Sequence, residues 1–235
     1  MGKQVATSAA KNIAAQRESM EDRLRGLGGG SGVSTIRLKN RHFVFPDEEL
    51  VPNELEVIVL DWALFNSYYK SEFVQGQTAF PDCFAVGQRA VDMVPSKNSP
   101  EIQNDGDPCA TCWANQFGSG KGNGKACQNR INLAVLLYDE GSEGDLYKIS
   151  VSPTGIKGWK EYVGKLASKG RAPADVVTLL SFDKKVAYDK LVFAASLEAT
   201  KDPEFKEDSE ACFERIPEAT EYLLSEPSPP SDEDE

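Results

Sequence analysis

Histidine is almost absent from this chain, because His42 is the only one in 235 residues. Nucleophilic mechanisms that rely on an imidazole base need a histidine beside the nucleophile. This scarcity therefore argues against most enzymes of that class. Neither an HExxH motif nor a dinucleotide-binding glycine fingerprint occurs in the sequence. We expect a protein that is not an enzyme.

Long apolar runs are missing as well. No stretch approaches the roughly 18 apolar residues that a membrane-spanning helix needs. The N-terminal segment contains no apolar core of the kind that a signal peptide carries. We expect a cytoplasmic protein that makes no contact with membranes, located in the host cytoplasm if the protein is viral.

Net charge is nearly absent from residues 1–200 and concentrated after them. Residues 201–235 contain thirteen Asp and Glu against three Lys and Arg, which gives −10 of the formal net charge of −11. The segment ends in SEPSPPSDEDE, a composition that buries too little apolar surface to offset its ordering entropy. We predict a disordered acidic C-terminal tail over residues 201–235, either a solubilising appendage or an interaction tail.

The opposite end of the chain is predicted to be a flexible arm. An amphipathic pattern in residues 1–25, which could form a helix, is followed by a glycine run from Gly26 to Gly32. Glycine-rich segments of this kind behave as flexible linkers. We predict an N-terminal arm and Gly-rich linker over residues 1–33, with the folded domain beginning near Ser34.

A basic and aromatic strand is predicted at the start of the folded domain. Residues 35–45, TIRLKNRHFVF, alternate so that successive side chains point to opposite faces of one strand. The apolar face holds Ile36, Leu38 and Val44. The opposite face combines cations with aromatic rings, and it consists of Arg37, Lys39, Arg41, Phe43 and Phe45. Cations and rings on one surface suit the phosphates and bases of a single nucleic-acid strand.

Five further strands and one helix are predicted from hydrophobic patterns. The strands are expected at residues 55–61, 131–138, 146–151, 175–182 and 190–197. A helix is expected between the third and fourth of these strands, because apolar residues recur there at helical spacing before a stop at Gly170. Its apolar face consists of Trp159, Tyr162, Val163 and Leu166.

This order of elements predicts a mainly β fold of the α+β type with one or two helices. Several strands, a helix and two closing strands suit an OB-like Greek-key barrel over residues 34–200. An α+β sandwich would give a similar string of elements and stays open as an alternative.

Four of the five cysteines lie in an insertion at about residues 80–130, in the pattern C-x25-C-x2-C-x14-C. The C-x2-C spacing lets two thiolates bind one tetrahedral ion. We predict a structural zinc ion in a zinc subdomain, held by Cys83, Cys109, Cys112 and Cys127. Two alternatives stay open. Cys83 could be a buried apolar residue, with another polar group or His42 as the fourth ligand, or the thiols could be free or redox-active.

A glycine-rich loop lies between the last two of these cysteines. It lacks the G-x4-G-K-[ST] spacing of a phosphate-binding loop. It does carry two lysines, and an arginine and two aromatic residues flank them. These residues suit contact with a nucleic-acid backbone and its bases, and they are Trp113, Phe117, Lys121, Lys125 and Arg130. The alternative is a loop that needs glycine only for the turns of a zinc site.

A further aromatic cluster follows the strand at residues 55–61, in the segment DWALFNSYYKSEF. At helical spacing, most of its rings are expected in the core. Tyr68 and Tyr69 are adjacent, so a single helix face cannot bury both. One of them is therefore predicted to be available for stacking on a base.

The combination of basic-aromatic strand, cysteine-bearing insertion, OB-like order and acidic C-terminus resembles the single-stranded-DNA-binding replication proteins of tailed bacteriophages. The stretch from Pro81 through CATCWANQFGSGKGNGKAC to Arg130 is also similar to a cysteine-containing segment of tailed-phage proteins. The resemblance is architectural, and the cysteine cluster here contains no histidine, unlike the best-known zinc-bearing members.

The resemblance implies a protein of phage-type DNA replication and recombination. Such a protein coats single-stranded DNA without strong sequence preference, and its acidic tail recruits a phage or host DNA polymerase, helicase or primase. Two other readings stay open. One is an acidic protein-interaction or anti-host protein that acts as a nucleic-acid mimic. The other is a metal-dependent nuclease that uses the strand-end carboxylates Asp61, Asp139 and Glu140.

Overall fold

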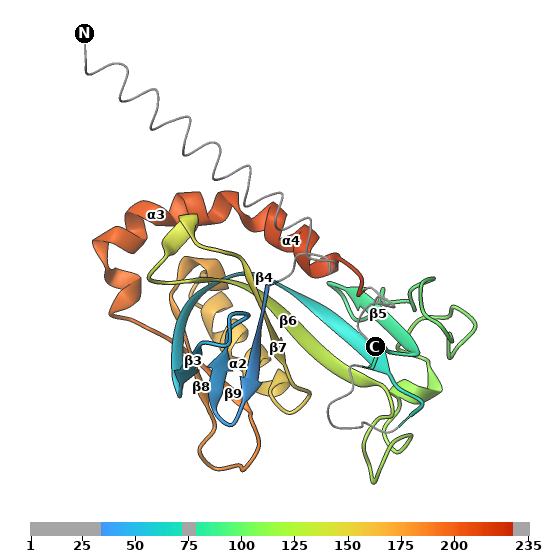
Figure 1. Cartoon of the computed structure of the whole chain (residues 1–235). Helices are drawn as coiled ribbons and strands as arrows, with labels where there is room; N and C mark the ends of the chain where they lie inside the picture. Colours follow the sequence, from blue (N-terminus) through green and yellow to red (C-terminus); the bar gives the residue numbers. More distant parts are fainter. Residues whose placement is uncertain (1–33, 72–78, 228–235) are drawn as a thin grey trace. The chain divides into compact units, whose positions relative to one another are not determined.

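The computed structural model describes residues 34–71 and 79–227, which contain nine strands and three α-helices (Figure 1). The predicted arm, residues 1–33, lies outside the described residues. The strands are β1 (Ser34–Lys39), β2 (His42–Val44), β3 (Leu50–Pro52), β4 (Glu54–Tyr68), β5 (Cys83–Gly87), β6 (Gln128–Leu137), β7 (Tyr147–Val151), β8 (Thr178–Phe182) and β9 (Leu191–Ala195). The helices are α2 (Ile156–Ala167), α3 (Pro203–Glu214) and α4 (Ile216–Leu224).

All nine strands belong to one curled mixed sheet that forms a half-barrel. The strand order is β3-β2-β1-β7-β6-β4-β8-β9, and β5 pairs with the C-terminal half of β4. Only the β1–β7 pair is parallel. The antiparallel set β8-β4-β6-β7 has the spatial order of a Greek key, because the fourth strand returns to lie beside the first. The prediction of a mainly β fold with helices is confirmed.

The strand β4 is longer than the sequence suggested. It continues through the aromatic segment that was predicted to be helical, and β6 pairs with it from Val57 to Ser67. A bulge between Val59 and Asp61 shifts the register once. The helical prediction is wrong because both faces of this strand are covered, which produces a nearly continuous apolar run without clear alternation. Tyr68 and Tyr69 therefore lie at a strand end and are both half-buried.

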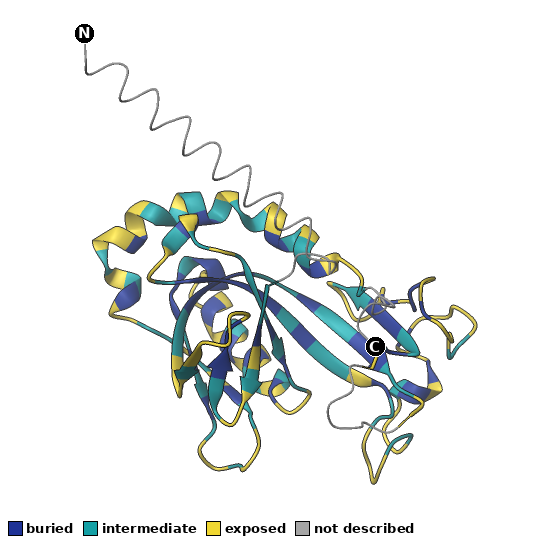
Figure 2. Cartoon of the chain, viewed as in Figure 1, coloured by how far each residue is buried: buried dark blue, intermediate teal, exposed yellow. Residues whose placement is uncertain are grey.

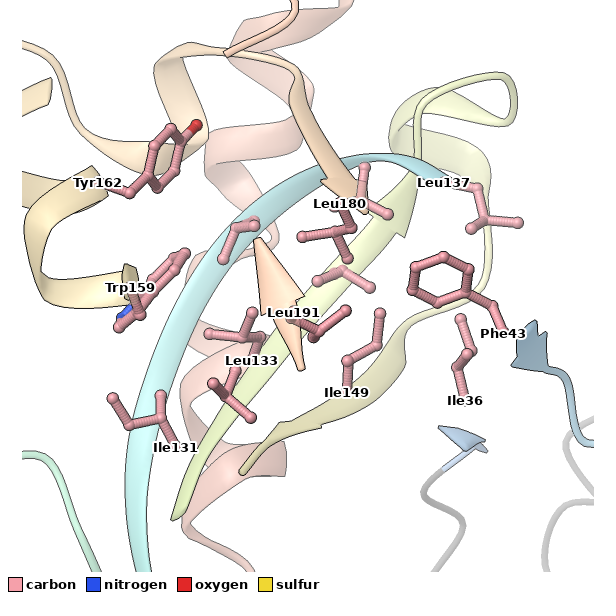
Figure 3. Packing of buried hydrophobic residues seen from close by; sticks show 14 of the residues in the cluster. Ile36, Phe43, Ile131, Leu133, Leu137, Ile149, Trp159, Tyr162, Leu180 and Leu191 are labelled. Carbon is pink, nitrogen blue, oxygen red and sulfur yellow. The ribbon is translucent and has the colours of Figure 1, made fainter. Parts of the chain in front are cut away.

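The concave face of the sheet is covered by α2. Trp159, Tyr162 and Leu166 are buried on this helix, as predicted, and Gly170 follows it with a φ of +67°. Figure 3 shows Trp159 and Tyr162 reaching from α2 toward the strands, with Phe43 at the other end of the same cluster. The hairpin of β8 and β9 was also predicted correctly.

The other face of the sheet is covered by α3 and α4, which corrects the prediction of a disordered tail. Residues 203–214 and 216–224 are helical, and Phe205, Cys212, Ala219 and Leu223 are buried against Ile58, Leu60, Ala134 and Leu136. Figure 2 shows the result, with buried strands beneath helices whose outer sides are exposed. The acidic composition concealed these helices because their glutamates project into solvent. Residues 228–235 lie outside the described part of the chain.

Polar contacts also fix the C-terminal helices to the domain. The Thr220 hydroxyl donates to Asp61 at 2.6 Å, and the Tyr222 hydroxyl donates to the Ser34 carbonyl at 2.9 Å. Beyond α4, the Glu226 carboxylate accepts bonds from Ser96 and Asn98, both at 2.7 Å. The folded unit therefore extends from Ser34 to Glu226 rather than ending near residue 200.

The predicted basic strand at residues 35–45 is instead a hairpin. Asn40 and Arg41 adopt left-handed φ values of 52° and 59° and form the turn between β1 and β2. Because of this turn, each residue after it lies on the opposite face of the sheet from the one that a single continuous strand would give it. Phe43 lies beside Leu38 on the core face and is fully buried, so the predicted face of cations and rings does not exist.

The β1–β2 and β8–β9 hairpins contact each other through side chains rather than through backbone strand pairing. The rings of Phe43 in β2 and Phe182 in β8 are 4.9 Å apart. This contact brings the ends of the curled sheet together around the concave core. No helix in the described part of the chain combines the length and apolar composition needed to cross a membrane.

Candidate functional site

The four cysteines of the insertion line one small cavity of about 20 Å³. Cys83 begins β5, opposite Tyr68 of β4, and Cys127 immediately precedes β6. Cys109 and Cys112 lie in the connection between these strands. The cavity has room for about one water-sized guest. Pairing of β5 with β4 thus brings the distant Cys83 to the tight C-x2-C pair.

Backbone hydrogen bonds hold the cysteine-bearing loops in place. The Cys109 amide donates to the Met93 carbonyl at 2.8 Å, and the Cys127 amide donates to the Ala114 carbonyl at 2.7 Å. The Asn115 side chain donates to the Cys109 carbonyl at 2.8 Å. The segment after Cys112 is therefore hydrogen-bonded to Cys127, just before β6, beside the cavity.

Burial raises the pKa of two of these thiols, Cys109 and Cys127, and so favours their neutral form in the absence of a cation. It raises the pKa of Cys127 to about 12, and the nearby Cys109, Cys112 and Cys83 add to this increase. Burial also raises the pKa of Cys109, although a hydrogen bond from Asn66 acts in the opposite direction. A bound cation would reverse this effect, because it favours the thiolate form.

The chemistry of the cavity fits a sulfur-ligated metal. Four thiols are the donor set of structural zinc sites, and among the described residues no carboxylate or imidazole lines the cavity. Asn104 also lines it, and its buried Oδ1 has no hydrogen-bond partner among the described residues. In residues 34–71 and 79–227, no three Cys, His, Asp or Glu side chains are arranged to hold an ion as they stand. Binding therefore requires the thiols to turn toward one another.

His42 is not among the residues that line the cavity. It pairs with Lys39 in the β1–β2 hairpin, and its Nδ1 lies 2.8 Å from the Asn40 carbonyl oxygen. The fifth cysteine, Cys212, is buried between α3, α4 and the sheet, where burial and Asp208 raise its pKa to about 12. Neither residue contributes to the cysteine cavity.

Two aromatic side chains are exposed on the glycine loop, which we define as residues 113–126. Trp113 is 50% exposed, and its ring lies edge-on to Tyr68 at 5.7 Å. Phe117 is 82% exposed, and the Lys125 ammonium lies 5.1 Å from its ring centre. Lys125 is fixed by hydrogen bonds to Asn115 and Asn129. The loop thus presents rings and a cation on a supported surface.

Glycine is required where this loop turns back on itself. The Gly118 and Gly120 amides both donate to the Gly124 carbonyl, at 2.9 and 3.0 Å. A Cβ on Gly120 would lie 2.7 Å from the carbonyl group of Lys125, too close for any other residue. Gly118 has a φ of +87°, which favours glycine as well. These glycines shape the surface that carries Phe117 and Lys125.

The predicted binding residues fall into two groups. One group surrounds the cysteine cavity and glycine loop: Tyr68, Tyr69, Trp113, Lys121, Lys125 and Arg130. Within it, Lys121 is exposed, while Arg130 is half-buried in β6 and donates to Gln128 at 3.0 Å. The other group belongs to the β1–β2 hairpin. There Arg37 pairs with Glu48 at 2.5 Å, Lys39 is exposed, and Arg41 is part-buried.

Sequence reasoning missed the residues that only tertiary structure brings together. Asn66 and Asn104 line the cysteine cavity but carry no local motif. Lys184 and Lys185 lie in the β8–β9 loop, which contacts the β1–β2 turn through Arg41. Such contacts join segments that are far apart in the sequence, so no pattern within either segment predicts them.

The carboxylates suggested for a nuclease do not gather at one place. Asp61 accepts hydrogen bonds from the Trp62 amide, Gln88 and Thr220, at 2.7, 3.3 and 2.6 Å. These bonds give it a structural role beneath α4. Asp139 and Glu140 are exposed in the turn after β6.

No family model, curated protein or solved structure matches this chain.

Proposed function

We propose that the protein binds single-stranded DNA without strong sequence preference, using the glycine loop as its stacking surface. The observation that carries this proposal is the exposure of Trp113 and Phe117 on a loop that also holds Lys125 beside the Phe117 ring. Exposed rings stack on bases of any identity, and neighbouring cations neutralise phosphates. The proposed activity is binding alone, without a catalytic step.

The arrangement of strands supports an OB-type barrel for this role. The strands β4, β6 and β7 form an antiparallel set, α2 follows, and β8 and β9 close the order with β8 beside β4. A helix before the last two strands is the order expected of that fold, which often binds single strands. In this proposal, the β1–β2 hairpin and the insertion are additions to the barrel.

Zinc bound by Cys83, Cys109, Cys112 and Cys127 would have a structural role. The glycine loop begins after Cys112 and ends before Cys127, so ligands flank it on both sides. The insertion has little other core, because its two buried clusters are small and include three of these cysteines. A metal would supply charge neutralisation and a cross-link, and thus hold the loop that carries Trp113 and Phe117.

The C-terminal region supports a second part of the proposal, which is recruitment of other proteins. Exposed glutamates recur along the outer sides of α3 and α4, at Glu204, Glu207, Glu210, Glu214, Glu218 and Glu221. Four more carboxylates follow in residues 228–235. In a phage replication system, these groups would contact a basic surface on a DNA polymerase, helicase or primase in the host cytoplasm.

The same glutamates favour the second candidate function, an acidic protein-interaction or anti-host protein. A regular series of carboxylates on a rigid helix pair can imitate the phosphates of nucleic acid. The two functions differ in the molecule that binds. A nucleic-acid mimic would bind basic proteins and would leave a labelled oligonucleotide free.

The proposed function is tested by replacing the two exposed rings. We expect Trp113→Ala combined with Phe117→Ala to weaken binding of a labelled oligothymidylate about 30-fold or more, since stacking contributes about 1–3 kcal/mol per base. Fluorescence anisotropy measures the affinity. Leu197→Ala is the matched control, because Leu197 is 67% exposed but lies after β9. Unchanged affinity of the double variant would exclude the glycine loop, and absence of wild-type binding would favour the mimic.

A further inference from the structure

A carboxylate joins two hairpins that are distant in the sequence. Asp189, in the β8–β9 loop, accepts hydrogen bonds from the backbone amides of Asn40 and Arg41, at 3.1 and 2.8 Å. Both turn residues have left-handed φ values, and consecutive amides in such turns form a concave anion-binding site. The β1–β2 turn is therefore attached to the β8–β9 loop.

The Arg41 side chain makes a second connection. Its guanidinium donates to the carbonyl of Val186 at 2.8 Å, so the tip of the β8–β9 loop lies against the turn. At the base of that loop, Lys190 pairs with Asp183 at 2.9 Å. The Lys185 amide also donates to Asp183, at 2.9 Å. Both carboxylates of the loop are thus engaged in holding its shape.

We define the turn patch as four exposed residues of these two joined segments, which are Lys39, Lys184, Lys185 and Tyr188. The three lysines are exposed, and Tyr188 is 52% exposed. None of the three ammonium groups forms an ion pair or hydrogen bond with another residue that the structure describes. Lysine ammonium groups bind phosphate as point charges, and an exposed ring stacks on a base.

The turn patch lies far from the glycine loop. The strand β4 begins at Glu54, which pairs with Ser181 near the β8–β9 loop, and ends at Tyr68 beside Trp113. Its 15 residues span on the order of 45 Å at the rise of an extended strand. Figure 1 shows the insertion and the β8–β9 hairpin at opposite ends of this strand.

We propose that the turn patch is a second phosphate-binding surface, which holds the same single strand that stacks on the glycine loop. This inference rests on the proposed function. A strand that reaches both surfaces gains the contacts of each, whereas a short oligonucleotide occupies only one. The glycine loop supplies stacking, and the turn patch supplies mainly electrostatic contacts that weaken as salt screens them.

The test compares two double variants. One carries Lys184→Ala and Lys185→Ala together, and the matched control carries Lys165→Ala and Lys169→Ala together. The control removes the same charge from an exposed surface at the end of α2. All four lysines are exposed, so both variants should fold. We would measure affinity for oligothymidylates of about 4 and about 16 nucleotides, the range of known site sizes, at several salt concentrations.

The Lys184 and Lys185 variant should bind the longer oligonucleotide about tenfold more weakly at low salt, with a salt slope smaller by about 0.7 for each lost phosphate contact. Its affinity for the short oligonucleotide should match that of the control. If the variant and control bind the longer oligonucleotide equally, the turn patch is overturned. The proposed function would then stand if Trp113→Ala with Phe117→Ala still weakens binding. Absence of binding by the wild-type chain would overturn both.

Discussion

A chain that ends at residue 200 is expected to lose its cooperative fold. The outer face of the sheet would then expose Ile58, Leu60 and Leu136, which α3 and α4 bury. Exposing three such side chains costs about 5 kcal/mol or more, as large as the whole stability of many domains. Thermal unfolding followed by circular dichroism measures the effect, and we expect no cooperative transition or one displaced to much lower temperature.

The matched control for this truncation is a chain that ends at Pro227. It lacks four carboxylates, Asp232, Glu233, Asp234 and Glu235, but keeps both helices and the Glu226 contacts. We expect its unfolding temperature to equal that of the full chain. A chain ending at residue 200 with the same unfolding transition as the full chain would contradict the assignment of α3 and α4 to the folded unit.

The second large effect concerns the cysteine cavity. We expect the protein, purified without chelator, to contain about one zinc ion per chain, and Cys109→Ser with Cys112→Ser to contain almost none. These two thiols form the tight C-x2-C pair of the four that line the cavity. Elemental analysis of the purified protein gives the metal content directly.

Two further variants separate ligands from other cysteines. The Cys212→Ala variant should retain its zinc, because Cys212 is buried between α3, α4 and the sheet and lies outside the cavity. Cys83→Ser should lose zinc if the thiol at the start of β5 is the fourth ligand. The zinc proposal is refuted if the wild-type chain carries no zinc, or if the double variant retains it.

The elements that were predicted correctly are those with local signals. The helix α2 has apolar residues at helical spacing and a glycine stop, and the β8–β9 hairpin has two apolar strands around a polar turn. The C-x2-C pair also has a recognisable spacing. Each of these signals lies within a few residues, so no tertiary contact is needed to read it.

The hairpin at residues 34–44 was missed because its turn has no glycine. Arg41 adopts a left-handed conformation, which is uncommon for a residue with a side chain. Its amide is held by Asp189, which is 148 residues away in the sequence. Alternation continues on both sides of the turn, and the sequence therefore reads as one strand.

The C-terminal helices were missed for a different reason. The prediction of disorder for residues 201–235 rests on their net charge. The same residues also contain Phe205, Cys212, Ala219 and Leu223, which are spaced by seven, seven and four residues. That spacing places them on one helical face, and it was the available signal. A segment with many carboxylates can still fold if its few apolar side chains share a face and the sheet offers a surface to cover.

The most direct test of the proposed stacking surface is tryptophan fluorescence during oligonucleotide binding. Trp159 is buried, and Trp62 packs against it at 5.7 Å, whereas Trp113 is 50% exposed on the glycine loop. Saturating oligothymidylate should quench the emission of the wild-type chain, and Trp113→Phe should abolish most of that quenching while anisotropy shows that binding persists. Equal quenching in wild-type and Trp113→Phe proteins, or no oligonucleotide binding by either, would contradict the account.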